Sequence, residues 1–515
     1  MRHHLRFADG LHGRGRTLSA ALLLLGAVAR PAAAADIAVA TGSSIQEALA
    51  TALPGDTLII EAGTYSEALQ SVTAASVDAP ITLRAAEGAR VVIGAGGTAV
   101  TLSHPGHVLD GLVLDGSYGP AAVLRIEDAA SDTRVTGVEV LQGGRSCVEL
   151  GAPENVTFEE SVIHHCLWWE DGAEDAHGIV AGAAIGLSLS GVEIHTFSGS
   201  GLLLDPNRDP AGWDALTVED STFWLAPLST AENGFPAGVV PGKNAIETRV
   251  AEDGGRPSVF VARTTAHGFS NGSADVTAAF YWKESVDVTM DRITVYDSAV
   301  AMRVRGPDDT RPDSAWLTLT NSLIYDVDVA FRYEDDVDRL ALWANTLGSG
   351  VDVPFVAVED EGQGLDVQNL LLLGSTLPIE ASTALGNLAV SELAFVDAAA
   401  HDYHLAEGSP ALDLGLDLPL VTTDFDGEAR PQGVGTDIGA DERAAEDSGD
   451  TDDTDVTEGD DTGLDSAEPE APGLSAAMRA GEVGGCHCAT GGVSGLPLGA
   501  LLGGLALLRR RRRLP

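Results

Sequence analysis

Four segments of the chain alternate between two kinds of side chain, which is the pattern of a β-strand with one buried face. They begin at Ala245, Ala279, Ala301 and Ala330. The second and fourth residues of each segment are predicted to point into a core: Ile246, Thr248, Phe280, Trp282, Met302, Val304, Phe331 and Tyr333. The third and fifth are predicted to point outward: Glu247, Arg249, Tyr281, Lys283, Arg303, Arg305, Arg332 and Glu334. If these strands stack, the outward residues form a charged ladder in which five basic side chains meet.

A second pattern repeats irregularly through residues 80–375 and predicts the architecture. It places Asn321, Asn345 and Asn369 at the same position of successive repeats, 24 residues apart. Upstream, the equivalent step is expected to be filled by Gly191, Asp220, Arg263 and Asp291. Asparagine tolerates left-handed backbone and can ladder with its counterparts above and below. A β-only period of this length favours an all-β, right-handed parallel β-helix of about a dozen coils over a β-propeller, whose blades need about 40 residues each.

The start of this solenoid is expected to carry a short capping helix. Ser44 and Glu47 form a capping box for a helix that runs through Ala52. Such a terminal element covers the open core of a solenoid. Two gaps in the repeat, 168–176 and 225–243, are long enough for loops that rise from one face.

Both ends of the chain differ from the repeating body, which we place at 36–445. Residues 1–35 combine a basic start, an apolar stretch and an alanine-rich cleavage site, as a secretory signal peptide does. Residues 446–484 are rich in acidic and small polar residues, so they are predicted to be a disordered linker.

The last segment, 485–515, carries three features in a fixed order. Cys486 and Cys488 flank a histidine, a glycine-rich apolar segment follows, and an arginine cluster comes last. This order resembles the C-terminal sorting signals of myxobacterial surface proteins, which a processing enzyme recognises and removes. The resemblance implies anchoring through the C-terminus, with the apolar segment as a transmembrane helix in the envelope membrane. Zinc binding by the Cys-His-Cys motif is disfavoured, because no distant fourth ligand closes a tetrahedral site.

The charge balance excludes one class of partner. The chain has 77 acidic residues against 30 lysines and arginines, for a net charge of −47. A nucleic-acid-binding surface is therefore not expected, whereas divalent cations would be attracted. Cys147 and Cys166 lie 19 residues apart. In an exported protein they either pair as a disulfide between neighbouring coils or stay as two buried thiols.

Two parts of the body resemble known families. Residues 44–93 contain Ile-Gln-Glu-Ala-Leu, Pro-Gly-Asp-Thr-Leu-Ile-Ile and Ala-Gly-Thr-Tyr. They resemble the opening of right-handed parallel β-helix proteins of the pectate-lyase type, which include alginate and chondroitin lyases. Residues 395–442 contain Asp-Tyr-His-Leu, Asp-Phe-Asp-Gly and Asp-Ile-Gly-Ala-Asp-Glu. They resemble the closing segment of bacterial surface β-helix proteins with interchangeable C-terminal anchors. Both resemblances imply fold and location, and neither contains catalytic residues.

The first resemblance implies uronic-acid polysaccharides as a substrate class. β-Elimination on such a polymer needs a base for the proton at C5, a cation that neutralises the uronate, and a group that assists the leaving oxygen. Lys283 is one of two lysines in the chain and falls in the basic column between Arg249 and Arg305. Lys283, Arg303 and Arg305 are therefore candidate catalytic residues.

The charged ladder also has a purely structural interpretation. Stacked charges of opposite sign neutralise one another across strands, as Arg305 beside Glu334 or Arg249 beside Glu284 would. The sequence leaves open whether the ladder balances itself, binds a polysaccharide or catalyses a reaction.

Two weaker candidates lie earlier in the body. His177 follows acidic residues and could act as an acid or base, although histidines in solenoids often fill turns. Asp205, Asn207 and Asp209 offer alternating oxygen ligands, which suits either a calcium site or an ordinary turn. Calcium is thus the one cofactor that the sequence raises.

Together these features predict an exported, surface-anchored β-helix protein that contacts extracellular or envelope polysaccharide through a basic outer face. The first alternative is a polysaccharide lyase or hydrolase that acts on uronic-acid polymers. The second is a passive structural or adhesive rod. Whether the protein is an enzyme is left open.

Overall fold

The computed structural model describes residues 34–169, 175–206, 212–251, 255–271, 277–307, 313–374 and 381–444. The predicted acidic linker 446–484 and the tail with Cys486 and Cys488 lie outside these residues, as does all but the end of the predicted signal peptide. Among the described residues, no helix is long and apolar enough to cross a bilayer.

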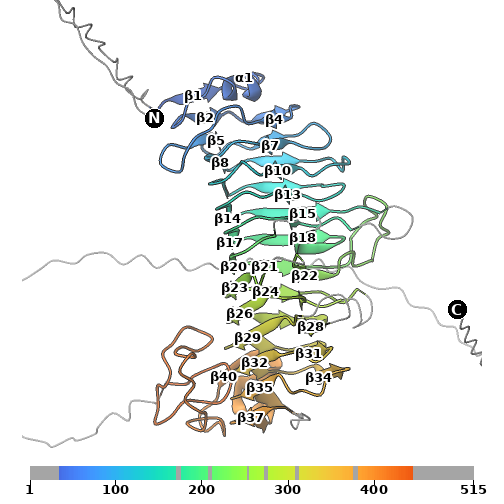
Figure 1. Ribbon diagram of the computed structural model, residues 1–515, viewed down its shortest axis with the longest axis vertical. Helices are drawn as coiled ribbons and strands as arrows, with labels where there is room; N and C mark the ends of the chain where they lie inside the picture. The colour runs from blue at the N-terminus through green and yellow to red at the C-terminus, as the bar shows by residue number, and fades with distance from the viewer. Residues whose placement is uncertain are drawn as a thin grey trace, which may run out of the picture. The chain divides into compact units, whose positions relative to one another are not determined.

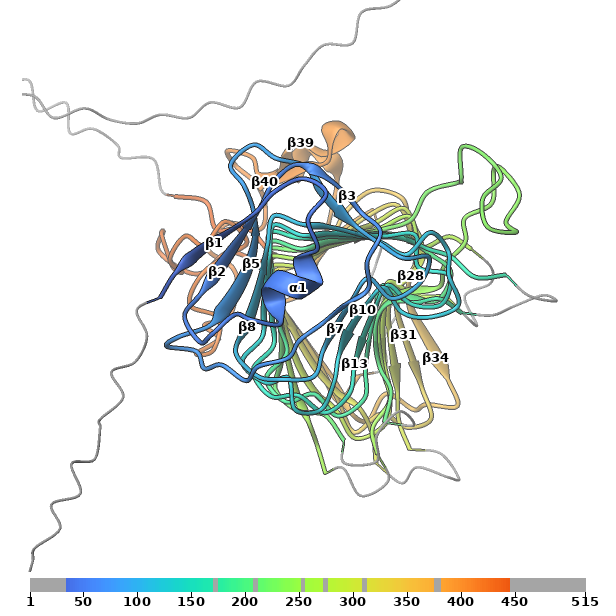
Figure 2. The same cartoon turned by 90° about the horizontal axis from the view of Figure 1, so that it is seen from above.

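The described chain winds into a β-helix with three long parallel sheets (Figure 1), which confirms the predicted fold. From β2 to β34, each coil adds one strand to sheet A, then to sheet B, then to sheet C. Seen from the N-terminal end, this path runs clockwise as it recedes from the viewer (Figure 2), so the coil is right-handed.

Within the described residues, sheet A has 14 strands, sheet B has 13 and sheet C has 11. The strands of sheet A are β1 (Asp36–Val39), β2 (Thr57–Ile60), β5 (Ile81–Ala85), β8 (His107–Asp110), β11 (Arg134–Thr136), β14 (Thr157–Glu159), β17 (Ser188–Ser190), β20 (Leu216–Glu219), β23 (Ser258–Ala262), β26 (Asp287–Asp291), β29 (Trp316–Thr320), β32 (Arg339–Trp343), β35 (Leu365–Gln368) and β37 (Thr383–Leu385). Those of sheet B are β3 (Gly63–Tyr65), β6 (Val91–Ile93), β9 (Val113–Asp115), β12 (Glu139–Leu141), β15 (Val162–Cys166), β18 (Glu193–Phe197), β21 (Thr222–Trp224), β24 (Thr265–His267), β27 (Thr294–Tyr296), β30 (Leu323–Ile324), β33 (Thr346–Leu347), β36 (Leu371–Leu373) and β38 (Leu388–Val390). Those of sheet C are β4 (Leu69–Gln70), β7 (Val100–Leu102), β10 (Leu124–Ile126), β13 (Val148–Leu150), β16 (Ile179–Ala181), β19 (Ser200–Leu204), β22 (Asn244–Thr248), β25 (Phe280–Trp282), β28 (Ser298–Arg305), β31 (Val327–Glu334) and β34 (Val351–Val358).

Both ends of the described coil carry additional elements. At the N-terminal end, α1 (Ile45–Leu49) lies over the core (Figure 2), and the Ser44 hydroxyl accepts a hydrogen bond from the backbone N–H of Glu47. The predicted cap is confirmed, although its helix ends before Ala52. At the C-terminal end, β39 (Phe395–Asp397) and β40 (Asp402–Leu405) form an antiparallel pair. One 3-10 helix, η1 (Glu392–Ala394), precedes β39, and another, η2 (Ala398–Ala400), connects the two strands.

The interior is built from vertical files of apolar side chains. Ile246, Phe280, Met302 and Phe331 lie directly above one another in sheet C. Each is at most 1% exposed, and all eight residues that the alternation placed inward are buried. Stacked apolar files of this kind supply the hydrophobic stabilisation that a single short strand cannot.

Between sheets A and B the chain turns through one residue with left-handed backbone. Asp220, Arg263, Asn321 and Asn369 occupy this step with φ of 51°, 47°, 49° and 53°, and Gly191 does so as well. These positions match the predicted register.

Two positions of the predicted register are wrong by one residue. Arg292, not Asp291, is the left-handed residue of its coil, and Ala344 takes that role in place of Asn345. The cause in the second case is Trp343, an apolar residue that faces outward and donates from Nε1 to Asp366. The inward residue is its neighbour Leu342, which is 0% exposed.

Asn345 instead ties one coil to the coil before it. Its Oδ1 accepts from the backbone N–H of Ser322 at 3.0 Å, and its Nδ2 donates to the carbonyl of Leu319 at 3.0 Å. Leu370 occupies the same position in the next coil, and Asn387 occupies it one coil later, where its Oδ1 accepts from the N–H of Leu370.

Cys147 and Cys166 form a disulfide, so of the two alternatives for this pair the structure selects the bridge. Both residues are fully buried.

Asn345→Ala is expected to lower the free energy of unfolding by about 1–3 kcal/mol, because it removes the side-chain acceptor of the Ser322 N–H and the hydrogen bond to the carbonyl of Leu319. Equilibrium urea denaturation of the chain measures this loss. Asn345→Ser should recover part of it, since Ser322 fills the same step one coil earlier. Gln363→Ala, at an exposed amide without left-handed backbone, is the control, and an equal effect of both alanine variants would contradict the assignment.

Candidate functional site

The outward residues of the four alternating segments lie together on the outer face of sheet C. Glu247 on β22 pairs in register with Tyr281 on β25, then with Arg303 on β28 and Arg332 on β31. Two residues further along the strands, Arg305 stands beside Glu334. We call this surface the charged face and define it by the following residues: Asp205, Glu247, Arg249, Tyr281, Lys283, Arg303, Arg305, Arg332, Glu334 and Asp335.

Glu247 is the centre of the upper half of the charged face. Its Oε1 lies 2.7 Å from Nζ of Lys283 and 3.5 Å from a guanidinium nitrogen of Arg249, and its Oε2 accepts hydrogen bonds from Ser200 and Asn244. Its side chain is 11% exposed. Burial alone would raise the pKa of Glu247, but Lys283, Arg249 and Ser200 outweigh it and lower the pKa to about 2.

Glu334 plays the same part in the lower half. Arg303 donates to both of its oxygens at 2.9 and 3.0 Å, Arg332 donates to Oε1, and Arg305 lies 3.6 Å from Oε2. The side chain of Glu334 is only 7% exposed. Burial opposes its ionisation, yet the hydrogen bonds from Arg303 and Arg332 hold the pKa of Glu334 below its usual range.

Tyr281 joins the two halves. Nζ of Lys283 lies 4.6 Å from the centre of its ring, and Cζ of Arg303 lies 4.4 Å from it. Two cations over one ring are within the range of cation–π attraction. The Arg305 guanidinium is buried in part, which would lower its pKa, but its hydrogen bond to Asp335 and its interaction with Tyr281 raise that pKa.

Every predicted basic residue of the charged face therefore contacts an acidic partner. Arg249 lies 3.8 Å from Asp205 and also contacts Glu247. Glu284, which the sequence suggested as a neighbour of Arg249, accepts a hydrogen bond from the backbone N–H of Val250. The cross-strand neutralisation raised from the sequence is present in the structure. Arg249 and Arg305 keep the most exposure among these basic residues, 39% and 29%.

The two weaker sequence candidates lie at the upper edge of this surface. His177 is 8% exposed, and its Nδ1 accepts from the backbone N–H of Ser200, so it lies one step from the Ser200–Glu247 hydrogen bond. Asp205 follows β19 and contacts Arg249. Its proposed calcium partners Asn207 and Asp209 lie outside the described residues.

A file of stacked rings runs down the outer face of sheet B, and the sequence reasoning missed it. From β15 to the end of η2 the rings are His164, His195, Trp224, His267, Tyr296, Tyr325 and His401, with centres 4.2 to 6.1 Å apart. Burial and the neighbouring imidazoles of His164 and His165 lower the pKa of His195 to about 3. Part of the signal was available, because His164, His195 and His267 occupy outward positions of alternating strand segments.

Comparison with solved structures finds likenesses to several polysaccharide lyases. The chain resembles the pectate lyase Pel9A with 13% identity and a TM-score of 0.46, over 79% of this chain and 96% of that one. It resembles a rhamnogalacturonan lyase with 12% identity and a TM-score of 0.46, over 70% and 91%. An alginate lyase from Paenibacillus sp. str. FPU-7 gives 15% identity and a TM-score of 0.41, over 63% and 98%. At these identities and scores the likenesses carry no information on activity.

No protein-family model matches the sequence, and no curated protein matches it.

Replacing Glu247 should change how stability depends on pH. A carboxyl whose pKa is lowered in the folded state stabilises the fold above its unfolded pKa of 4.5 and loses that contribution as pH falls towards 2. Above pH 5, the free energy of unfolding of the wild type is expected to exceed that of Glu247→Gln by about 3 kcal/mol. This difference should disappear near pH 2. Urea denaturation of both proteins across this range measures it. A gap that does not change with pH would contradict the Lys283–Glu247 assignment.

Proposed function

We propose that the charged face of sheet C binds an acidic polysaccharide of the uronic-acid class. The observation that carries this proposal is the concentration of charge: five of the 30 basic residues in a chain of net charge −47 lie on one face of four consecutive strands. Elsewhere an acidic surface repels such a polymer, so this face is where a polyanion meets the least repulsion.

The arrangement of the cations supports an extended ligand. Strands of a sheet lie about 4.8 Å apart, a step comparable to the length of one sugar unit. Arg249 and Lys283 directly follow β22 and β25, and the other cations lie on β28 and β31. They therefore fall at successive positions along the axis of the coil, as a polymer with one carboxylate per sugar requires. Arg249 and Arg305 are the best exposed of them, so they are the residues that we expect to meet the ligand first.

The proposal extends to location. We propose that the protein is exported and displayed at the cell surface, where it would meet such polymers. The disulfide between Cys147 and Cys166 supports this, since disulfides persist in oxidising compartments.

Binding is tested with alginate and polygalacturonate, with dextran as the uncharged comparison, in affinity electrophoresis at increasing salt. We expect retardation by the two acidic polymers, and we expect salt to weaken it. The double variant Arg249→Gln, Arg305→Gln should weaken binding at least about tenfold, because hydrogen bonds to charged groups contribute about 1.5–3 kcal/mol each.

The matched control for this experiment is Arg263→Gln. Arg263 is 37% exposed and paired with Glu219 and Asp220, but it lies at the turn between sheets A and B. Equal weakening by the control, or equal retardation by dextran, would contradict a site on the charged face.

A second candidate function is β-elimination by the same face, favoured by the placement of Lys283. It is one of two lysines in the chain, and it lies beside Tyr281 with Arg303 on the same ring. In this reaction a base takes the C5 proton, the C4–O bond breaks, the electron pair forms the C4–C5 double bond, and the leaving oxygen gains a proton. The arginines would neutralise the uronate.

Elimination produces an unsaturated sugar end that absorbs in the ultraviolet, so the initial rate on uronic-acid polymers can be followed directly. If the charged face is catalytic, Lys283→Ala should lower this rate by about 10²–10⁴-fold. Lys243→Ala, at the other lysine, which pairs with Asp175, should leave it unchanged. No absorbance with wild type would exclude elimination and leave the binding proposal standing.

A further inference from the structure

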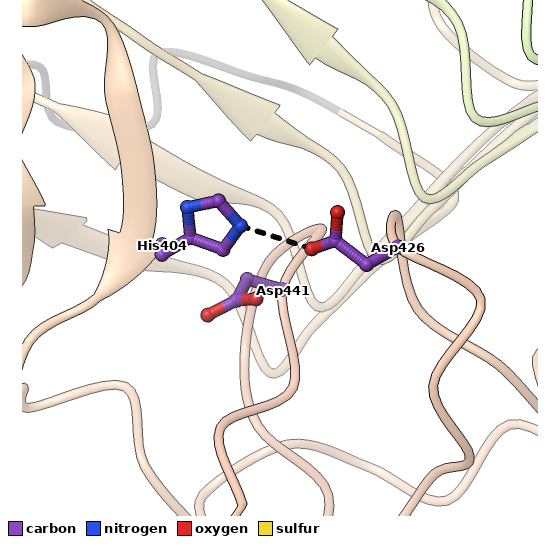
Figure 3. A group of neighbouring side chains, drawn as sticks. All are labelled: His404, Asp426 and Asp441. Carbon is purple, nitrogen blue, oxygen red and sulfur yellow. Dashed lines mark hydrogen bonds and ion pairs between the residues drawn. The ribbon is translucent and has the colours of Figure 1, made fainter. Parts of the chain in front are cut away.

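A second cluster of functional side chains lies far from the charged face in sequence, in the closing segment. His404 on β40, Asp426 in the following loops and Asp441 near the end of the described chain come together (Figure 3). One ligand atom from each lies within 4.8 Å of the others. Nothing in the charged face depends on this group, so the two can be tested separately.

The imidazole of His404 is fixed in one orientation. Its Nδ1 lies 2.5 Å from a carboxylate oxygen of Asp402, two residues earlier on the same strand, and its Nε2 faces Asp426 at 3.0 Å (Figure 3). A carboxylate on one imidazole nitrogen holds the proton there and directs the other nitrogen towards a metal. This is the usual outer-shell arrangement of metal-binding histidines.

Asp441 adds a mostly buried carboxylate to this group. It is 8% exposed, and its Oδ2 accepts a hydrogen bond from the backbone N–H of Leu405 at 2.7 Å. One of its oxygens lies within 4.8 Å of the ligand atoms of His404 and Asp426. Burial disfavours the charged form of a carboxylate, and a divalent cation bound there would stabilise it.

The cluster also borders a hollow that could admit an ion. A cavity of about 240 Å³ is lined by the three residues together with Leu323, Tyr403 and Phe425. Its walls come from both the coil (β30) and the closing segment, so the cavity lies where these two parts pack.

We propose that His404, Asp426 and Asp441 bind a divalent transition-metal ion, with zinc as the preferred one. An imidazole nitrogen and carboxylate oxygens are ligands of zinc, whereas calcium takes oxygen ligands alone. Three protein ligands leave a coordination position that faces the hollow. The ion joins β40 to two loops of the closing segment, so it stabilises the C-terminal end of the coil by mass action.

The test is a zinc titration of the full chain by calorimetry after removal of metals with EDTA. Cys486→Ser and Cys488→Ser are introduced first, because thiolates in the tail would compete for zinc. We expect one zinc ion per chain, a rise in Tm with zinc, and no rise with calcium. With cobalt in place of zinc, visible absorption bands should report nitrogen and oxygen ligation.

Three variants locate the site. Asp426→Asn changes an exposed ligand without disturbing packing, and Asp441→Asn changes the buried ligand. Each variant should abolish the stoichiometric binding of zinc. Asp402→Asn, at the positioning residue, should weaken it by about 10–100-fold. His401→Asn is the matched control, since it removes a neighbouring imidazole that lines the same hollow but keeps a residue that tolerates left-handed backbone.

The alternative is that His404 is an imidazolium held between Asp402 and Asp426, with no metal. In that case zinc neither binds stoichiometrically nor raises the Tm of the full chain, and the proposal is wrong. It is equally wrong if His401→Asn removes binding as completely as Asp426→Asn, or if calcium binds as tightly as zinc.

Discussion

In-register stacking of parallel strands is the constraint on which the rest of this structure depends. Backbone hydrogen bonds hold each residue about 4.8 Å from its counterpart in the next coil, so every outward position becomes part of a file. Files of apolar and aromatic side chains are stabilised by this stacking. Files of like charges are destabilised by it, and Arg303 lies directly beside Arg332 in sheet C. Glu334 contacts both guanidinium groups, and this one carboxylate offsets the repulsion that the register imposes.

The same constraint gives two neighbouring sheets different outer chemistry. Sheet B carries the stacked rings from His164 to His401, whose faces cover one another and leave mainly their edges to solvent. Sheet C carries alternating cations and carboxylates around Tyr281. The rings contact one another, whereas Arg249 and Arg305 of the charged face keep partly exposed guanidinium groups beside their acidic partners. These are the two groups through which we propose that the face meets a ligand.

Much of this could be predicted from the sequence, and the failures have physical causes. Alternation placed the strands that begin near Ala245 and Ala301 in register, because period-two patterning is unambiguous when one face is buried. It failed at Asn345, where the outward Trp343 imitates a core residue. The His404 cluster could not be predicted, because its members lie on one strand and two irregular loops that no periodicity relates. The pairing of Cys147 with Cys166 also needed three-dimensional information, since the spacing suited either alternative.

The five-residue helix α1 has a consequence for solubility. A solenoid is open at its first coil, and an open coil offers both a bare apolar interior and strands that another copy can extend. Ile45 and Leu49 fill that opening from above. Another copy can therefore stack on the first coil only after α1 is displaced, and this short helix protects the chain against end-to-end growth into a fibre.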